Sequence, residues 1–149
     1  MNALHEHGQS RDEMAPEPSA DAPVRLPPIQ VRTGAGEVAG FLRETGGDRT
    51  LGFVPLTFPC RWLALPALRG LILQLIGGKG FLPVHEAQSY AYEHELRIET
   101  DYVLDVEARR TAEPPRLTFK MVVSTGQGEI CAHLETVLRI VPLNLEPAS

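Results

Sequence analysis

The sequence lacks an uninterrupted apolar run long enough to cross a membrane. Its longest apolar stretch lies between Phe53 and Ile76, and Arg61, Pro66, Arg69 and Gln74 interrupt it. A membrane-spanning helix needs about 20 predominantly apolar residues with few or no charges. The first residues also lack the basic start and apolar run of a signal peptide. We therefore predict no membrane span, a cytoplasmic location, and a buried helix within this stretch.

A basic excess is also missing. The chain has 14 Lys and Arg against 19 Asp and Glu, a net charge of −5 and a pI near 5.5. A nucleic-acid-binding surface needs a basic face, so we expect no nucleic-acid partner. Cysteine is also scarce. Cys60 and Cys131 lie far apart in the sequence and form no CxxC motif, which favours two buried reduced thiols. No nucleotide-binding or nucleophile motif and no cluster with metal-ligand spacing is present, so we expect no cofactor and no metal.

The composition divides the chain into three parts. Residues 1–28 hold five prolines and five acids against two arginines, and they are poor in large apolar residues. Such a segment cannot bury enough surface to offset its ordering entropy, so we predict a flexible acidic tail. Residues 29–142 are expected to form one domain, and residues 143–149 a C-terminal tail. The hydrophobic content of 43% suffices for a real core.

Apolar periodicity predicts a short strand over Ile29–Arg32, a helix over Glu37–Glu44 and a longer helix over Thr57–Ile76. Pro59 suits a first helical turn, whereas Pro66 lacks an N–H and should kink the helix or start a second one. After Pro66 almost no polar face remains. A helix that is apolar nearly all round must be surrounded by protein.

Four strand-like runs follow: Val84–Leu96, Asp101–Ala112, Arg116–Thr125 and Glu129–Val141. The last three carry apolar residues at every second position. This pattern indicates strands with one buried face, and the short links between them predict an antiparallel meander. A sheet with one apolar face and a helix with apolar surface in every direction are both covered if the sheet curls around the helix. The unprotected sheet edges predict a homodimer or a heterodimer with a similar chain.

This arrangement, α+β with a long central apolar helix wrapped by a curved antiparallel sheet, is the hot-dog fold. Two segments narrow the resemblance. Residues 55–58 read PLTF before the helix, and the strand after it carries Val84, His85, Gln88 and Tyr92 at the spacing hydrophobic-H-x-x-Q-x-x-x-Y. Over residues 31–141 the chain resembles the MaoC-like acyl dehydratases, in particular their N-terminal dehydratase-type domain.

The resemblance implies a protein that binds acyl thioesters of coenzyme A or acyl carrier protein, and a reaction that adds water reversibly to a 2,3-enoyl thioester. Such chemistry needs an acid, a base and dipoles on the thioester oxygen. Active members supply the acid and base from an Asp-x4-His motif. Asp48 stands at the position of that Asp, but five residues later the chain has Phe53 instead of His. The resemblance therefore implies a non-catalytic or partner subunit.

The remaining candidate residues follow from their spacing. His85 and Glu86 are the nearest acid–base pair, although neighbours in a strand point to opposite faces. Asp48 is either a turn residue or a base. Arg61 and Arg69 are eight residues apart, so they share one helix face, where they either meet a pantetheine phosphate or an acidic partner, or extend into solvent. Gln88 and Tyr90 are candidates for substrate binding, with strand packing as the alternative for Tyr90.

Two other functions stay open at this point. The chain could be an active dehydratase or thioesterase of the same fold that uses His85, or Glu86 with an ordered water. It could also be a non-enzymatic binder of an apolar ligand, since one scaffold hosts several activities.

Overall fold

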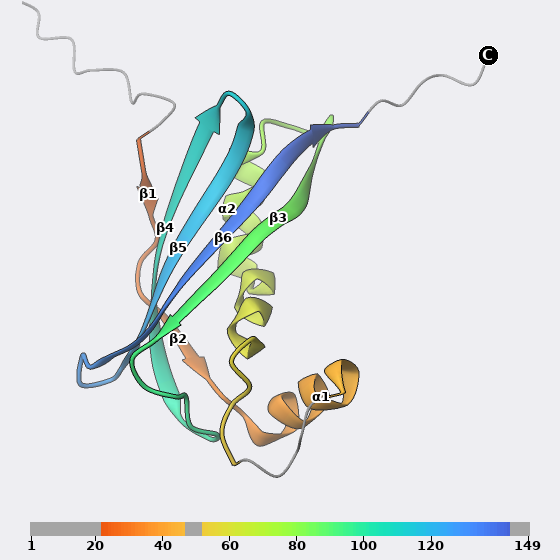
Figure 1. Ribbon diagram of the computed structural model, residues 1–149. Helices are drawn as coiled ribbons and strands as arrows, with labels where there is room; N and C mark the ends of the chain where they lie inside the picture. The colour runs from red at the N-terminus through yellow and green to blue at the C-terminus, as the bar shows by residue number, and fades with distance from the viewer. Residues whose placement is uncertain (1–21, 47–51, 144–149) are drawn as a thin grey trace, which may run out of the picture.

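The computed structural model describes residues 22–46 and 52–143, so the predicted base Asp48 and most of both predicted tails lie outside the described residues. A single six-stranded sheet lies against one layer of helices, and α2 runs along one face of the sheet (Figure 1). In chain order the elements are β1 (Val24–Arg25), β2 (Ile29–Arg32), α1 (Ala35–Thr45), the 3-10 helix η1 (Phe58–Ala64), α2 (Pro66–Leu75), β3 (Phe81–Tyr92), β4 (Asp101–Ala112), β5 (Pro115–Thr125) and β6 (Ile130–Pro142).

The sheet is antiparallel, with strand order β1-β4-β5-β6-β3, and β2 also pairs with β4. The predicted meander holds for β4, β5 and β6, which are consecutive neighbours. It is wrong for β3, which pairs with β6 and forms one edge of the sheet. The link over residues 93–100 therefore crosses the end of the sheet instead of closing a hairpin.

Contacts far away in sequence hold this link in place. Thr33 is fully buried, and its hydroxyl donates to the carbonyl of Arg97 and accepts from the N–H of Thr100. The N–H of Val54 donates to the carbonyl of Leu96. The carboxylate of Glu99 accepts from the N–H of Ala35, the first residue of α1. These long-range bonds could not be read from the length of the link, which is why the hairpin prediction failed.

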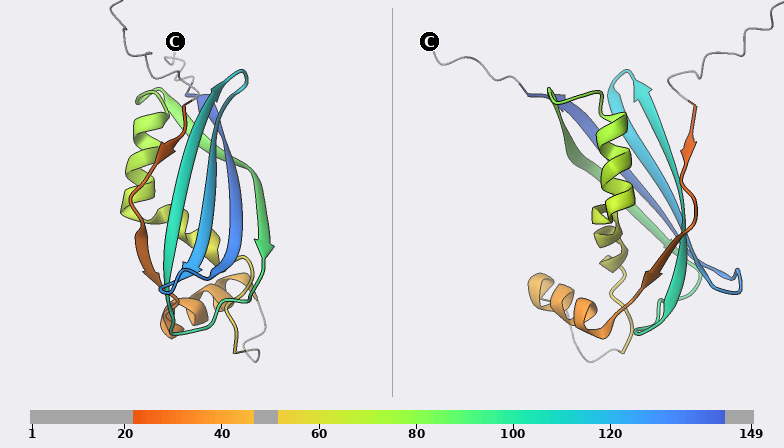
Figure 2. Two further views of the ribbon diagram at one scale, coloured as in Figure 1. Left: turned by 90° about the vertical axis from the view of Figure 1, so that its left-hand side faces the viewer. Right: turned by 180° about the vertical axis from the view of Figure 1, so that it is seen from behind.

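The buried face of the sheet matches the predicted alternation. Cross-strand neighbours on β4, β5 and β6 form one apolar layer of nearly inaccessible side chains: Tyr102, Leu104, Val106, Ala108, Leu117, Phe119, Met121, Val123, Ala132, Leu134, Leu138 and Ile140. Figure 2 shows that α1, η1 and α2 lie on one side of the sheet, while no described element covers the other side. The side that faces the helices is called the inner face below.

Pro66 divides the predicted long helix in two. Leu65 takes an extended ψ of 143°, as residues before proline prefer, and α2 starts at Pro66. The prediction that protein surrounds the helix holds for one side only. Leu68 and Leu71 are buried against the sheet, whereas Leu73 is 72% exposed. No helix in the described ranges is long and apolar enough to cross a membrane.

The N-terminal elements extend the sheet and close one end of the core. The predicted strand over 29–32 is β2, and the predicted helix is α1, which ends at Gly46 with a φ of 70°. The tail predicted over 1–28 is wrong at its end, because Val24–Arg25 forms β1 and pairs with Glu107 and Ala108 of β4. A strand of two residues is too short to give a recognisable pattern in the sequence.

Candidate functional site

The edge strand β3 carries most of the candidate residues, and a bulge sorts them between its two faces. Residues directly opposite each other in an antiparallel pair lie on the same face. His85 pairs with Leu138, and Gln88 pairs with Thr136, both on the inner face of β6. The register shifts between His85 and Ala87, which leaves Glu86 as the extra residue. His85 and Gln88 therefore share the face on which the helices lie.

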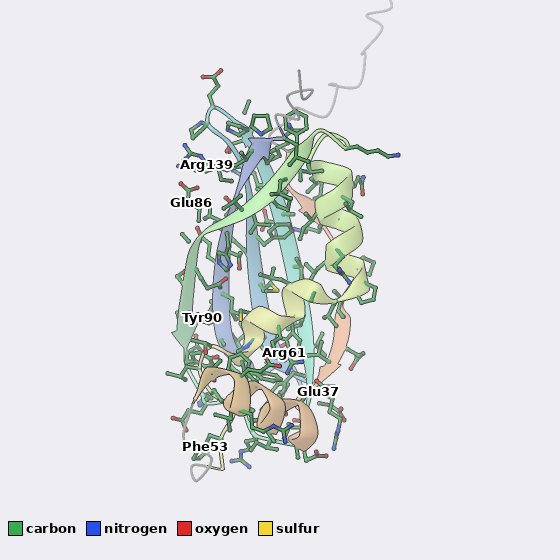
Figure 3. All side chains as sticks on the ribbon, turned by 90° about the vertical axis from the view of Figure 1, so that its right-hand side faces the viewer. Glu37, Phe53, Arg61, Glu86, Tyr90 and Arg139 are labelled. Carbon is green, nitrogen blue, oxygen red and sulfur yellow. The ribbon has the colours of Figure 1, made fainter. Side chains whose placement is uncertain are left out.

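Glu86 lies on the other face of the sheet. Its two carboxylate oxygens accept from Nε and Nη2 of Arg116 at 2.7 and 2.8 Å. Arg116 belongs to the outer face, since its neighbour Leu117 is buried on the inner face. In Figure 3, Glu86 and Arg139 lie on the side of the sheet away from α2. The bidentate hydrogen bond from Arg116 lowers the pKa of Glu86, with a smaller contribution from the charge of Arg139. The structure thus separates Glu86 from His85.

This ion pair gives a pH-dependent prediction. Replacing Glu86 with Gln should lower the melting temperature at pH 7 by roughly one or two degrees, since exposed ion pairs contribute little. Arg116 lowers the pKa of Glu86 in the fold, so the pair stabilises the protein above the pKa of an unfolded glutamate, about 4.3. That stability is lost as the pH falls through the folded pKa. Thermal melts of the two proteins should therefore converge as the pH falls through the folded pKa of Glu86, and a constant difference would contradict the pairing.

A polar pair interrupts the inner apolar face. Thr136 is fully buried, and its hydroxyl donates to Oε1 of Gln88 at 2.6 Å. A buried hydroxyl without a partner would be costly, so Gln88 satisfies Thr136. The remaining surface of Gln88 is partly exposed at the edge of the sheet. The predicted substrate-binding residue thus has a structural partner and still lies on the inner face.

Two tyrosines further along β3 reach the turn before η1. The hydroxyl of Tyr92 donates to the carbonyl of Leu56, and that of Tyr90 donates to the carbonyl of Thr57 at 3.4 Å. Burial raises the pKa of both phenols, and the neighbouring Cys60 adds to the effect; the pKa of Tyr90 rises to about 12. Both hydroxyls therefore remain protonated donors at neutral pH. They mark the point where β3, the PLTF turn and η1 meet.

The two arginines that share a helix face in the sequence have different surroundings. Nη1 of Arg61 donates to the carbonyl of Glu37 at 2.9 Å, and its guanidinium lies over the ring of Phe58. This contact joins η1 to α1, as Figure 3 shows near the labels Arg61 and Glu37. Arg69 is exposed on α2, and within residues 22–46 and 52–143 it makes no ion pair or side-chain hydrogen bond.

An open groove of about 450 Å³ runs along the exposed side of η1 and α2 and reaches β3. One charged residue and six uncharged ones line it: Arg69 with Cys60, Leu63, Ala64, Ile72, Leu73 and Pro83. The volume is within the range of small-molecule sites. Cys60 connects the groove to the two tyrosines, because its N–H donates to the carbonyl of Thr57 that also accepts from the hydroxyl of Tyr90. The groove can accept an apolar ligand with an anionic group.

Two further hollows, of about 490 and 240 Å³, lie on the outer face of the sheet. Glu107, Lys120 and Glu135 line both of them. No group of three His, Cys, Asp or Glu residues in the described part of the chain could hold a metal ion. Both cysteines are free, and Cys131 is buried.

Sequence reasoning missed the groove and the role of Tyr92. The groove forms because the sheet covers only one side of the apolar helix α2. No local pattern in the sequence reveals which side of the helix stays uncovered. Thr136 did carry a signal, since it is the one hydroxyl in the otherwise apolar series of β6. Its partner on β3 depended on the pairing of β3 with β6, which the short links concealed.

Comparisons with known proteins identify the fold. No family model and no curated protein matches the chain. Among solved structures, it resembles the (R)-hydratase from A. caviae involved in PHA biosynthesis, with a TM-score of 0.51 and 22% identity over 80% of this chain and 94% of that one. It also resembles the C-terminally truncated HadBC (3R-hydroxyacyl-ACP dehydratase) complex from Mycobacterium tuberculosis, with a TM-score of 0.59 and 14% identity over 79% and 95% of the chains.

A third solved structure that resembles the chain is an enzyme with a different activity. The 1,4-dihydroxy-2-naphthoyl-CoA thioesterase Slr0204 from Synechocystis has a TM-score of 0.59 and 8% identity, over 85% of this chain and 88% of that one. Together these likenesses confirm the predicted α+β hot-dog fold. Since all three identities lie below 25%, they establish the fold, and the function has to be argued from the site.

Proposed function

We propose that the chain is a hot-dog protein that binds acyl thioesters of coenzyme A or acyl carrier protein and serves as a non-catalytic or partner subunit of a (3R)-hydroxyacyl or enoyl thioester dehydratase. The observation that carries this proposal is the apolar groove beside the tyrosine-bearing strand β3. The similar structures include a 1,4-dihydroxy-2-naphthoyl-CoA thioesterase and a 3R-hydroxyacyl-ACP dehydratase complex, and both of these act on thioesters.

The described part of β3 brings no acid–base pair together on the inner face, which supports the non-catalytic part. Position 53 holds Phe where the resemblance requires His. On β3, His85 lies on the inner face, while Glu86 is bonded to Arg116 on the outer face. Gln88, Tyr90 and Tyr92 supply hydrogen-bonding groups on the inner face, without a carboxylate among them. These groups can form hydrogen bonds to a thioester, but without a carboxylate among them they do not form an acid–base pair that could transfer protons.

The exposed edge of the sheet supports a partner chain. β3 pairs with β6 on one side, and in the described sheet its other side has no neighbour. Phe81, Leu82 and Val84 are 39 to 47% exposed along this edge. An edge strand with exposed apolar side chains favours pairing with another strand. We propose that β3 joins a homodimer or a heterodimer with a second hot-dog chain, in the cytoplasm, where the free thiols Cys60 and Cys131 would stay reduced.

A second candidate function is an active dehydratase or thioesterase that uses a relocated acid or base. The observation that favours it is the position of His85 on the inner face beside Gln88. In that case His85→Ala would abolish turnover without lowering stability, whereas Glu86→Gln would leave turnover unchanged. A purely apolar-ligand binder remains the third reading of the same groove.

The test combines binding and turnover on the full chain. Octanoyl-CoA at 100 times its dissociation constant should add about 2.7 kcal/mol to the free energy of unfolding. Octanoic acid at the same concentration should add much less, because it lacks the thioester and its carrier. We expect this stabilisation together with no hydration of 2-octenoyl-CoA.

Each result has a distinct meaning for the proposal. Fast hydration by the chain alone would refute the non-catalytic role. Stabilisation by octanoic acid but by no thioester would refute thioester binding and favour the apolar-ligand binder.

A further inference from the structure

The outer face of the sheet, opposite the helices, has a basic end near the turn between β4 and β5. Arg109, Arg116 and Arg139 lie on this face, and Arg116 is directly opposite Arg139. Glu86 neutralises Arg116 through two hydrogen bonds. Arg109 and Arg139 are exposed, and within residues 22–46 and 52–143 neither forms an ion pair with Glu113 of the turn or with any other acid. The three arginines are called the basic end below.

The charge of the outer face changes sign along the strands. In the middle of the face, Lys120 lies between Glu107 on β4 and Glu135 on β6. Beyond that row, away from the basic end, the face carries Asp105 and Glu93. An anionic segment that meets this face is therefore attracted to one end of it and repelled from the other.

The N-terminal part of the chain reaches the sheet from the basic end. β1 is antiparallel to β4, and Val24 lies opposite Ala108. The residues before Val24 therefore approach from the direction of Arg109, and Figure 1 shows β1 beginning toward the turn that joins β4 to β5. Residues 1–21 contain five acids and one arginine, a net charge of −4. The acidic segment thus precedes β1 at the end of the face where the arginines lie.

We propose that residues 1–21 bind the basic end through their acidic side chains and cover Arg109 and Arg139 against other anions. The length of the segment permits this contact. β6 is three strands away from β1, or about 14 Å at the usual spacing between strands. The seven residues from Glu17 to Val24 span up to about 23 Å when extended, so acids within the segment can reach Arg139.

Zero-length coupling with a carbodiimide tests the proposal on the full chain, because it joins a carboxylate to an amine only when the two are in contact. The chain has two lysines, Lys79 and Lys120. Lys120 lines the smaller hollow of the outer face, whereas Lys79 lies between α2 and β3. We expect peptides from residues 1–21 joined to Lys120. Coupling of Lys120 to its strand neighbours Glu107 and Glu135 serves as the internal reference.

Replacing Arg109 and Arg139 together with Gln should lower this coupling about fivefold relative to the reference, because exposed ion pairs are lost. The matched control is Arg43→Gln combined with Arg97→Gln, which removes the same charge from exposed residues of α1 and of the link after β3. The control should preserve the coupling, which excludes an effect of net charge. Thermal melts of both variants should match the wild type, since all four side chains are exposed.

A mixture of unlabelled and isotope-labelled protein shows which chain supplies the segment. If residues 1–21 bind their own chain, both parts of each cross-linked peptide carry the same label. Peptides with mixed labels would mean that a second copy supplies the segment, and they would overturn the proposal.

Other results would also overturn it. Coupling of residues 1–21 to Lys79 alone would place the segment away from the outer face. The reference product without any coupling of residues 1–21 to Lys120 would mean that the segment does not bind the basic end. Coupling that survives the loss of Arg109 and Arg139, or that falls equally in the control variant, would remove these arginines as its partners. The proposed function is independent of each of these results.

Discussion

Replacing Leu68 with Ala is expected to lower the free energy of unfolding by about 2–5 kcal/mol. Leu68 is completely inaccessible and lies in the core cluster between α2 and the inner face of the sheet. Removing its side chain deletes apolar contacts and leaves a cavity that the surrounding sheet can fill only in part. Since a domain of this size is stable by roughly 5–15 kcal/mol, the variant should unfold at much lower urea concentration.

Leu73→Ala is the matched control, because it makes the same chemical change on the same helix. Leu73 is 72% exposed, so its loss should change stability by less than about 0.5 kcal/mol. Urea denaturation followed by circular dichroism at low protein concentration measures both variants. Equal costs at the two positions would contradict the one-sided burial of α2 and would mean that Leu73 is covered in solution.

The second large effect is expected from filling the groove. Ala64 is exposed at the end of η1 and lines the groove, so Ala64→Trp should place an indole in the space proposed for the acyl thioester. We expect octanoyl-CoA to bind at least tenfold more weakly, since a ligand cannot share that volume. The melting temperature should hardly change, because the new side chain does not enter the core.

Ala67→Trp controls for the bulk of the new side chain. Ala67 is also exposed, lies three residues further along the same segment and does not line the groove. Calorimetric titration should give wild-type affinity for octanoyl-CoA with this variant. Equal loss of affinity in both variants would point to a general disturbance of α2, and no loss in either would remove the groove as the site.

The strands show what local patterning can predict. The alternation over Asp101–Ala112 gave both the bounds of β4 and its buried face, because strand neighbours along the chain are also neighbours in the sheet here. The same rule failed for β3, whose partner β6 lies nearly forty residues later. Bonds from Thr33 and Val54 decide the path of the intervening link, and those bonds exist only after the whole domain has folded.

The site shows the same limit at the level of single residues. Arg61 and Arg69 are equivalent in the sequence, eight residues apart on one helix face. The structure distinguishes them, because Glu37 and Phe58 occupy Arg61 and leave Arg69 beside the groove. The opposite orientation of His85 and Glu86 was predictable from strand geometry, but the bidentate bond between Glu86 and Arg116 was not. Asp48 lies outside the described residues, and its role stays a prediction.

The central claim is that an acyl thioester on its carrier lies between η1–α2 and the edge strand β3. A crystal structure of the full chain with octanoyl-phosphopantetheine tests it most directly. We predict electron density for the acyl thioester in the groove, along Leu63, Ala64 and Ile72. Density for the ligand on the outer face of the sheet, beside Lys120 and Glu135, would contradict the account.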